Sequence, residues 1–325
     1  MKIVIPDDYQ GIFLNSPNMA RLKAIGDVIV HTEKIRDEAD AVARMRGATV
    51  VLCNRERTPL SRKVLEALPE LRLLSMTGTG FPNIDLAAAN ELGILITRTP
   101  GQSVRAVAEL AYALMLATSR KIAYGDRMVR GGGWPGIAGG ELQGKTLGIV
   151  GLGTIGSDVA SIAPAFRMKV VAWGPTLTPE RAAVAGAIYL PLRELLQQAD
   201  IISLHLRLTK ETKGTIGAAE LAQMKRTAIL INTARAALTD EVALVRALQE
   251  GQIGGAGLDV YMEEPIPADS PLLKLDNVVL SPHTGWTTAE VFERFVTTAV
   301  DNVVNYLSGN PTEMLNPEVR QTINV

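Results

Sequence analysis

Short aliphatic runs alternate along the first hundred residues with segments in which apolar residues recur every three to four positions. The aliphatic runs predict buried strands at residues 2–5, 27–31, 49–53, 71–76 and 94–97. The segments between them predict helices near residues 17–25, 37–46, 60–68 and 85–92. Such alternation is typical of a parallel sheet that is covered by helices on both faces.

The middle of the chain has a different pattern. Pro100 and Gly101 precede an alanine-rich stretch, which predicts one long helix from Val104 to about Arg130. Residues 131–140 contain six glycines and a proline, so we expect a loop there.

The strand and helix alternation resumes after Lys145. Strands are predicted at residues 146–150, 169–173, near 187–190, and at 200–204, 227–231, 255–259 and 278–280. Helices are predicted from Thr154, from Pro179, at 192–198 and from about 287 to 307. The fold class that follows is α/β, with two doubly wound parallel-sheet domains of Rossmann or flavodoxin-like type, joined by long helices.

Composition narrows the class of protein. The 325 residues are enough for two domains, and 47 % are hydrophobic although only 4 % are aromatic. The net charge is −1 and no segment concentrates lysine or arginine, which disfavours a nucleic-acid partner. No apolar run reaches the roughly 18 residues that a membrane span needs. With Cys53 as the single cysteine, no disulfide framework or cysteine-built metal site is expected, and we interpret the chain as a cytoplasmic protein.

A glycine-rich turn follows the strand at 146–150. Gly151, Gly153 and Gly156 fit the pattern G-x-G-x-x-G, with an aliphatic strand before them and a helical segment after them. In that context the glycines let the backbone approach a pyrophosphate at a helix N-terminus. The turn predicts a dinucleotide site that also includes Thr154 and Ile155.

The next strand ends at Gly174, where an aspartate commonly binds the adenosine ribose. Without a carboxylate, neither the contact to the 2′-hydroxyl nor the repulsion of a 2′-phosphate is present. Arg181 is the first basic residue that follows. NAD is the expected cofactor, and NADP is not excluded.

Three segments that follow strands carry candidate chemistry: the one with Arg235, the one with Glu263 and Glu264, and the one with His283. Histidine can exchange a proton near neutral pH, and a neighbouring carboxylate orients the ring and favours its charged form. Arginine can bind a substrate carboxylate through two parallel hydrogen bonds. Oxidation of a 2-hydroxy acid, or reduction of a 2-oxo acid, needs these functions.

Other residues have weaker roles in this scheme. Asp259 is expected near the nicotinamide, and His205, at the end of a strand, is interpreted as lining the cofactor. His31 has no partner motif and is interpreted as structural.

Taken together, the chain resembles the D-2-hydroxyacid dehydrogenase family over nearly its whole length. The resemblance rests on Gly151–Gly156, Asn232–Arg235, Leu258–Pro265 and Ser281–Gly285, and upstream on Thr77–Asp85 and Thr99–Glu109. It implies that Arg235 binds the substrate carboxylate, that His283 is the acid–base, and that Glu264, which directly precedes Pro265, pairs with it. It also implies a homodimer built around the long helix.

The resemblance also implies which residues contact each ligand. Residues 1–99 and 287–325 would form the substrate domain, and residues 100–286 the NAD(P)-binding Rossmann domain. Besides the glycine loop and Gly174, the cofactor side would include His205, Leu206, Thr233, Ala234, Asp259 and Gly285. The substrate side would include Thr79, Gly80, Arg235 and Trp286.

Some positions depart from the family pattern. Ala236 and Pro82 replace a usual glycine and aspartate, and Trp286 either narrows the pocket or packs at the domain junction. Arg55 and Arg57 either bind a second anionic group of the substrate or form a solvated loop.

The sequence is compatible with two functions. The first is an oxidoreductase that acts on small 2-hydroxy or 2-oxo acids. The second is a nicotinamide-sensing, corepressor-like interaction protein on the same scaffold. The absence of long polar tails and of a basic face favours the enzyme.

Overall fold

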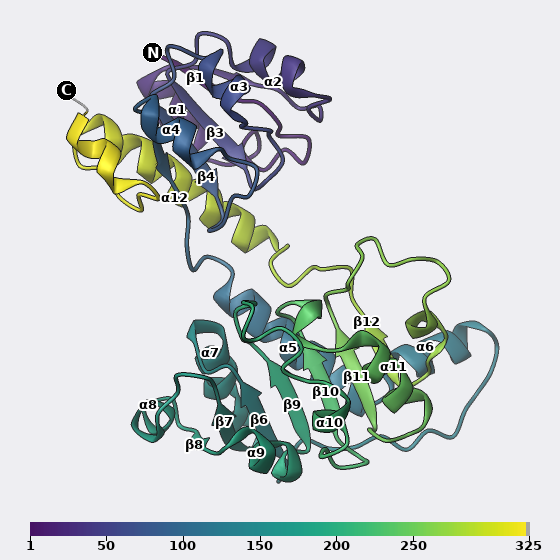
Figure 1. The fold of residues 1–325 in the computed structure, drawn as a ribbon. Helices are drawn as coiled ribbons and strands as arrows, with labels where there is room; N and C mark the ends of the chain where they lie inside the picture. The colour runs from purple at the N-terminus through teal and green to yellow at the C-terminus, as the bar shows by residue number, and fades with distance from the viewer. Residues whose placement is uncertain (323–325) are drawn as a thin grey trace. The chain divides into compact units, whose positions relative to one another are not determined.

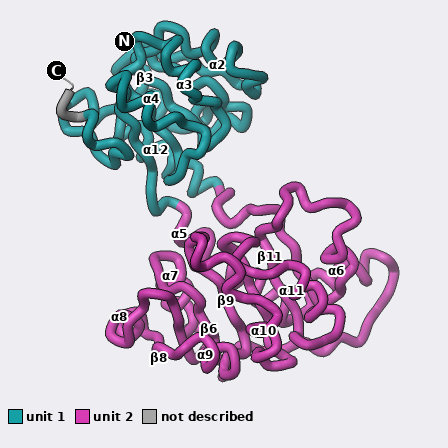
Figure 2. Tube along the Cα trace, in the orientation of Figure 1, with its two compact units in different colours: residues 1–102, 289–325 teal, residues 103–288 magenta. Residues whose placement is uncertain are grey.

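The computed structural model describes residues 1–322 and contains two parallel β-sheets, each in its own unit of the chain (Figures 1 and 2). Unit 1 combines Met1–Gln102 with the segment that begins at Ala289, and unit 2 is Ser103–Thr288. The sequence-based boundaries lie after residues 99 and 286. The expected α/β class with two parallel-sheet units is confirmed.

The sheet of unit 1 has the order β2-β1-β3-β4-β5, and all its strands are parallel. The strands are β1 (Lys2–Ile5), β2 (Asp27–Val30), β3 (Val50–Asn54), β4 (Leu73–Thr77) and β5 (Leu95–Thr97). This is the flavodoxin-like order.

Alternation of side chains along each strand explains why helices cover both faces of this sheet. Ile3 and Ile5 share one cluster of buried side chains with α1 (Met19–Ile25) and α12 (Ala289–Leu307). Val4, between them, belongs to the opposite cluster. The helices of that second face are α2 (Glu38–Met45), α3 (Arg62–Glu66) and α4 (Leu86–Glu91). A short 3₁₀ helix, Pro317–Thr322, ends the described part of the chain.

The sheet of unit 2 has seven parallel strands in the order β12-β11-β10-β9-β6-β7-β8. They are β6 (Thr146–Val150), β7 (Lys169–Trp173), β8 (Ile188–Tyr189), β9 (Ile201–Leu204), β10 (Ile229–Asn232), β11 (Gly255–Leu258) and β12 (Val278–Leu280). The chain builds outward from β6 to β8 and then returns to β9 on the other side of β6. In open sheets of this kind, ligands bind beyond the carboxyl ends of the strands at this reversal.

Helices again cover both faces. The cluster on one face includes α5 (Val104–Ser119), α7 (Thr154–Ile162) and α8 (Pro179–Val184). The cluster on the other face includes α9 (Leu192–Gln198), α10 (Ala218–Leu221) and α11 (Glu241–Gln249). Short 3₁₀ helices occupy Ala163–Phe166, Ala236–Leu238 and Pro271–Lys274.

The single long helix predicted from Val104 to about Arg130 is wrong. The structure has α5, ending at Ser119, and a separate helix α6 (Ile122–Arg130), and Lys121 between them takes a left-handed conformation with φ of 53°. The Ser119 carbonyl accepts the N–H of Gly140, 2.8 Å away, instead of one from the next helical turn. Contact with the returning glycine loop therefore ends the helix.

No helix within residues 1–322 is both long and apolar enough to cross a membrane. In the same part of the chain, no three or more His, Cys, Asp or Glu side chains gather in a group suited to a metal ion.

Candidate active site

The glycine loop between β6 and α7 has the geometry of a phosphate cradle. Gly151 has a φ of +103°, and a Cβ there would lie 2.6 Å from the Leu206 nitrogen. A Cβ on Gly156 would overlap the Gly151 carbonyl oxygen, so α7 packs directly on the loop. Gly153 is exposed and a Cβ there would meet nothing within 4 Å. The loop therefore leaves open space in front of the α7 N-terminus, where a pyrophosphate fits.

The segment after β10 carries Arg235 and is held by the last residue of the strand. The Asn232 side-chain oxygen accepts the Ala234 N–H, and its amide nitrogen donates to the Arg235 carbonyl, each over 3.0 Å. The Arg235 guanidinium is exposed and donates to the Ala234 carbonyl over 2.7 Å. Thr233 has a buried hydroxyl oxygen without a hydrogen-bond partner among the described residues, so a bound polar group can occupy that position.

Asp259, just after β11, holds the segment after β12. Its carboxylate is buried, and its two oxygens accept the N–H groups of Thr284 and Gly285 over 2.8 and 2.9 Å. Both bonds lie immediately C-terminal to His283. The structure thus gives Asp259 a structural role, and its expected contact with the nicotinamide stays a prediction.

His283 and Glu264 form a hydrogen-bonded pair. The His283 Nδ1 lies 2.8 Å from the Glu264 Oε2, while the Glu264 Oε1 accepts the Tyr261 N–H over 3.1 Å. Partial burial opposes ionisation of this carboxyl, but its bonds to His283 and Tyr261 and the charge of Arg235 hold the pKa of Glu264 below its usual value. Glu264 is therefore a carboxylate at neutral pH. With Nδ1 engaged in this way, the Nε2 of His283 is the ring nitrogen available to a substrate.

A small apolar hollow of about 380 Å³ borders the pair. Glu264 and His283 line it together with Tyr261 and five apolar side chains, among them Ile266 and Leu273. The Tyr261 hydroxyl oxygen lies 2.9 Å from the Ser281 carbonyl oxygen and 3.1 Å from that of Leu258, so its one proton bonds between them, and burial raises its pKa to about 12. Tyr261 thereby ties the segment after β11 to the segment after β12.

The three catalytic candidates share one edge of the sheet. Arg235 follows β10, Glu264 follows β11 and His283 follows β12, and these strands are neighbours in the sheet. Because all three are parallel, their carboxyl ends meet at the same edge. The influence of Arg235 on the pKa of Glu264 reflects this proximity.

His205 directly follows β9 beside the glycine loop. A Cβ on Gly151 would lie 2.7 Å from the His205 carbonyl carbon, and the His205 Nε2 is 2.8 Å from the Ser203 hydroxyl. Burial lowers the pKa of His205 to about 4, so the ring is neutral near pH 7. His205 and Leu206 thus lie beside the glycine loop, and their contact with a cofactor stays a prediction.

The remaining substrate-side predictions fall into different units. Thr79 and Gly80 are exposed in the loop after β4 of unit 1, where the Thr99 hydroxyl accepts the Gly78 N–H over 2.7 Å. Trp286 is half-buried in unit 2, three residues after His283. Their roles stay predictions.

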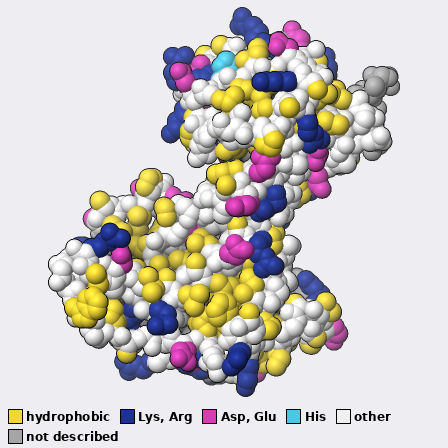
Figure 3. Space-filling view, turned by 180° about the vertical axis from the view of Figure 1, so that it is seen from behind, with side chains coloured by type: hydrophobic (Ala, Val, Ile, Leu, Met, Phe, Trp, Pro, Cys, Tyr) yellow, Lys and Arg dark blue, Asp and Glu magenta, His cyan; other side chains and the backbone are white. Residues whose placement is uncertain are grey.

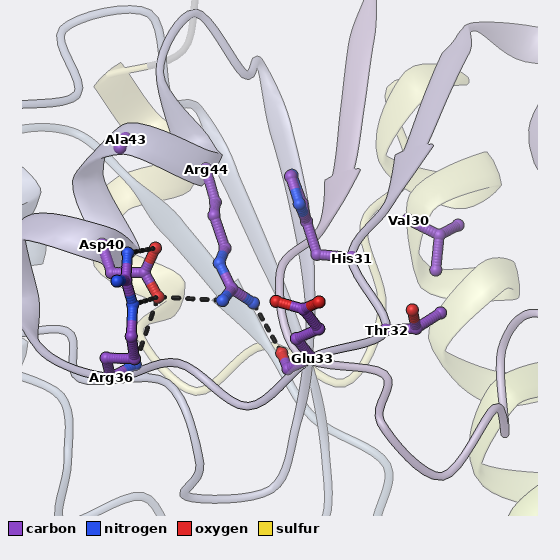
Figure 4. Close-up of a pocket in the computed structure, with 8 residues that line it drawn as sticks. All are labelled: Val30, His31, Thr32, Glu33, Arg36, Asp40, Ala43 and Arg44. Carbon is purple, nitrogen blue, oxygen red and sulfur yellow. Dashed lines mark hydrogen bonds and ion pairs between the residues drawn. The ribbon is translucent and has the colours of Figure 1, made fainter.

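A larger hollow of about 710 Å³ lies in unit 1, far along the chain from these residues (Figure 4). Asp40 bonds to both Arg36 and Arg44, and Arg44 also donates to the Glu33 carbonyl. Asp40 thus pairs with both guanidinium groups, and burial lowers the pKa of His31, so this histidine is neutral near pH 7. We therefore interpret the side chains that line this hollow as structural.

Sequence reasoning assigned no role to Asn232 or Tyr261, which position the segments of the site. The signal for Asn232 is its place at a strand end, where an Asn side chain commonly bonds the backbone of the next residues. The sequence has no comparable signal for Tyr261, because its two carbonyl partners become neighbours only through pairing of β11 with β12.

Comparison with known proteins agrees with this geometry. Residues 112–285 match the model described as "D-isomer specific 2-hydroxyacid dehydrogenase, NAD binding domain", and they lie inside unit 2. A glyoxylate reductase from Korarchaeum cryptofilum is 41 % identical over 268 residues, which are 80 % of this chain and 81 % of that protein.

Solved structures are similar over nearly the whole chain. The TT0316 protein of Thermus thermophilus has a TM-score of 0.84 and 37 % identity, covering 97 % of this chain and 100 % of that one. An acyclic imino acid reductase in complex with NADPH and D-Arg has a TM-score of 0.80 and 32 % identity, covering 97 % and 100 %. The chain therefore belongs to the D-isomer specific 2-hydroxyacid dehydrogenases and is an NAD(P)-dependent oxidoreductase of this family.

Proposed function

We propose that this chain reduces small 2-oxo acids to D-2-hydroxy acids, with His283, Glu264 and Arg235 as its catalytic group. The observation that carries the proposal is the 2.8 Å His283–Glu264 pair, which lies at the same sheet edge as Arg235. Glyoxylate is the first substrate to test, because the Korarchaeum cryptofilum relative is a glyoxylate reductase.

Each residue of the group has a separate task. Arg235 binds the substrate carboxylate and fixes the position of the neighbouring carbonyl carbon. His283 donates a proton from Nε2 to the carbonyl oxygen as it becomes an alkoxide. Glu264 orients the ring through Nδ1 and stabilises its charged form before the proton leaves.

The glycine loop suits a dinucleotide. A pyrophosphate fits the open space at Gly153, which the close contact of Gly156 with Gly151 leaves in front of α7. The Thr233 hydroxyl has no partner within residues 1–322, so it can bind a nearby polar group of the dinucleotide. Bound NADH or NADPH supplies the hydride. Within the chain, Gly151, Gly153, Thr154, Ile155 and Gly156 would hold the pyrophosphate.

We assign the cofactor domain to unit 2 and the substrate domain to unit 1. Support for the first comes from the glycine loop and from the match of residues 112–285 to an NAD binding domain. For the second, Gly80 offers exposed backbone in the loop after β4, next to Thr79. On this proposal, Thr79, Gly80 and Trp286 contact the substrate.

We also propose a homodimer. None of the nine residues of α6 is buried within the chain, and Trp134, in the loop after it, is 90 % exposed. Hydrophobic side chains gather on the face of unit 2 that Figure 3 shows. An apolar surface of this kind is typical of a protein–protein contact.

The reaction is tested by following loss of NADH and NADPH with glyoxylate, hydroxypyruvate and pyruvate. His283→Ala should lower kcat by about 10²- to 10⁴-fold, the usual contribution of a positioned acid–base. Arg235→Ala should chiefly raise KM for the 2-oxo acid. Glu263→Gln, one residue before Glu264 and exposed, is the matched control and should retain activity. Full activity of His283→Ala would refute the assignment.

A further inference from the structure

The end of β7 lacks the group that usually selects NAD. Gly174 follows the strand directly, at the position where a carboxylate would bind the 2′-hydroxyl of the adenosine ribose. A Cβ on Gly174 would make only ordinary contacts, 3.5 Å from the Leu177 Cβ and 4.0 Å from the Gly151 Cα. The second distance places Gly174 beside the phosphate loop. A side chain could fit here, so crowding does not explain the absence of a carboxylate.

An arginine lies over the loop that follows. Arg181, in the first turn of α8, turns back so that its Nη1 donates to the Thr176 carbonyl over 2.8 Å, while its N–H bonds to the Thr178 hydroxyl over 3.3 Å. The first bond holds the guanidinium beside the carbonyl of Thr176, which is two residues after Gly174 in the chain. Arg181 is exposed, and a guanidinium has five N–H donors, so most of its donors remain available.

Arg181 has no ion-pair partner in the part of the chain that the structure describes. None of the ion pairs among residues 1–322 includes Arg181. The adjacent carboxylate, Glu180, bonds to the Thr178 hydroxyl and to its own N–H, which hold its pKa below the usual value. The Glu180 carboxylate thus caps the start of α8 and does not pair with Arg181.

We propose that this chain prefers NADP(H) to NAD(H), with Arg181 binding the 2′-phosphate beside Gly174. The inference rests on the proposed function and adds which dinucleotide the same site selects. A phosphate monoester suits an exposed guanidinium, which can donate two parallel hydrogen bonds to it. With glycine at position 174, no carboxylate repels the phosphate.

The test is calorimetric titration of the full chain with NADP⁺, NAD⁺, 2′,5′-ADP and 5′-AMP, with no substrate present. The wild-type chain should bind NADP⁺ at least about tenfold tighter than NAD⁺, and 2′,5′-ADP tighter than 5′-AMP by a similar factor. Arg181→Ala should remove both preferences and leave the affinity for NAD⁺ unchanged. Gly174→Asp should weaken NADP⁺ and strengthen NAD⁺.

Arg226→Ala is the matched control. Arg226 is an exposed arginine of the same unit that precedes β10, so it lies at the opposite edge of the sheet from Gly174. It should bind all four probes as the wild-type chain does.

Two results would overturn the inference: wild-type affinity for NAD⁺ equal to or greater than for NADP⁺, or equal weakening of both by Arg181→Ala. Either result leaves the dehydrogenase reaction intact. Binding of neither dinucleotide would contradict the proposed function itself.

Discussion

A buried carboxylate holds the backbone that presents His283. Asp259 is 1 % exposed, and its carboxylate oxygens accept the N–H groups of Thr284 and Gly285. Burying a carboxylate is costly unless hydrogen bonds replace its water, and bonds to a charged acceptor are the strong ones. His283 itself has a φ of 55°, a left-handed conformation that costs a non-glycine residue about 1–3 kcal/mol. The bonds of Asp259 offset that cost.

His205 should make the stability of unit 2 fall as the pH is lowered. Its pKa in the folded chain is about 4 and its ordinary value is 6.5. As the pH falls below about 6.5, the unfolded chain binds a proton that the folded chain does not bind until about pH 4. The free energy of unfolding therefore falls across this range, by about 2 kcal/mol between neutral pH and pH 5.

Urea unfolding of the wild-type chain and of His205→Gln at pH 7 and pH 5 measures this contribution. Glutamine has no titrating group, so the variant should lose less free energy of unfolding between the two pH values. An equal loss in both proteins would show that His205 is protonated as readily in the folded chain as in the unfolded one.

At the scale of elements, alanine substitutions at two of the three glycines of the phosphate loop should have different effects. A Cβ on Gly156 would overlap the backbone of Gly151, so Gly156→Ala should separate α7 from the loop and cost about 1–3 kcal/mol of stability. A Cβ on Gly153 meets nothing within 4 Å, so Gly153→Ala should fold normally.

Gly153→Ala should nonetheless weaken NADPH and NADH binding, because its methyl group would occupy the space that the pyrophosphate needs. Thermal unfolding and calorimetric titration of both variants separate the two effects. A stable Gly156→Ala chain with normal binding would contradict the packing argument.

Elements whose residues have a strong local pattern are predicted best from the sequence. The strands at Thr146–Val150, Lys169–Trp173 and Val278–Leu280 have the predicted bounds. The break between α5 and α6 is not predicted, because it depends on Gly140, twenty residues downstream of Arg120. Helix α11 is absent from the sequence-based prediction, although Asp240 at its N-cap is a recognisable start signal.

The same distinction applies to the site. Motifs in the sequence single out Arg235, Glu264 and His283 as catalytic candidates. The strand before the glycine loop and the helix after it single out the loop as a dinucleotide site. Their convergence requires that β10, β11 and β12 be neighbours, which no local pattern states. Motifs likewise do not show that Arg181 bonds to the Thr176 carbonyl, because that depends on the side chain turning back from α8 to the loop before it.

At the scale of the whole molecule, both units use the same design. Each is a parallel sheet with helices on both faces, so each presents all its strand-end loops at one edge. Loops at such an edge can vary without disturbing the buried strands. Thr79 and Gly80 follow a strand in unit 1 as Arg235 and His283 do in unit 2. On the proposed function, the chemistry therefore resides in loops, while the cores specify the fold.

The proposed homodimer gives a prediction for the assembled molecule. Sedimentation should show twice the 34.8 kDa of one chain. Val129, 51 % exposed on α6, would lie in the contact, so Val129→Asp should bury a charge there and shift the protein toward the monomer. Val242→Asp is the matched control, since Val242 is 81 % exposed on α11, which covers the other face of the sheet from α5. A wild-type chain that sediments as a monomer at micromolar concentration, or equal dissociation by both variants, would refute a dimer contact through α6.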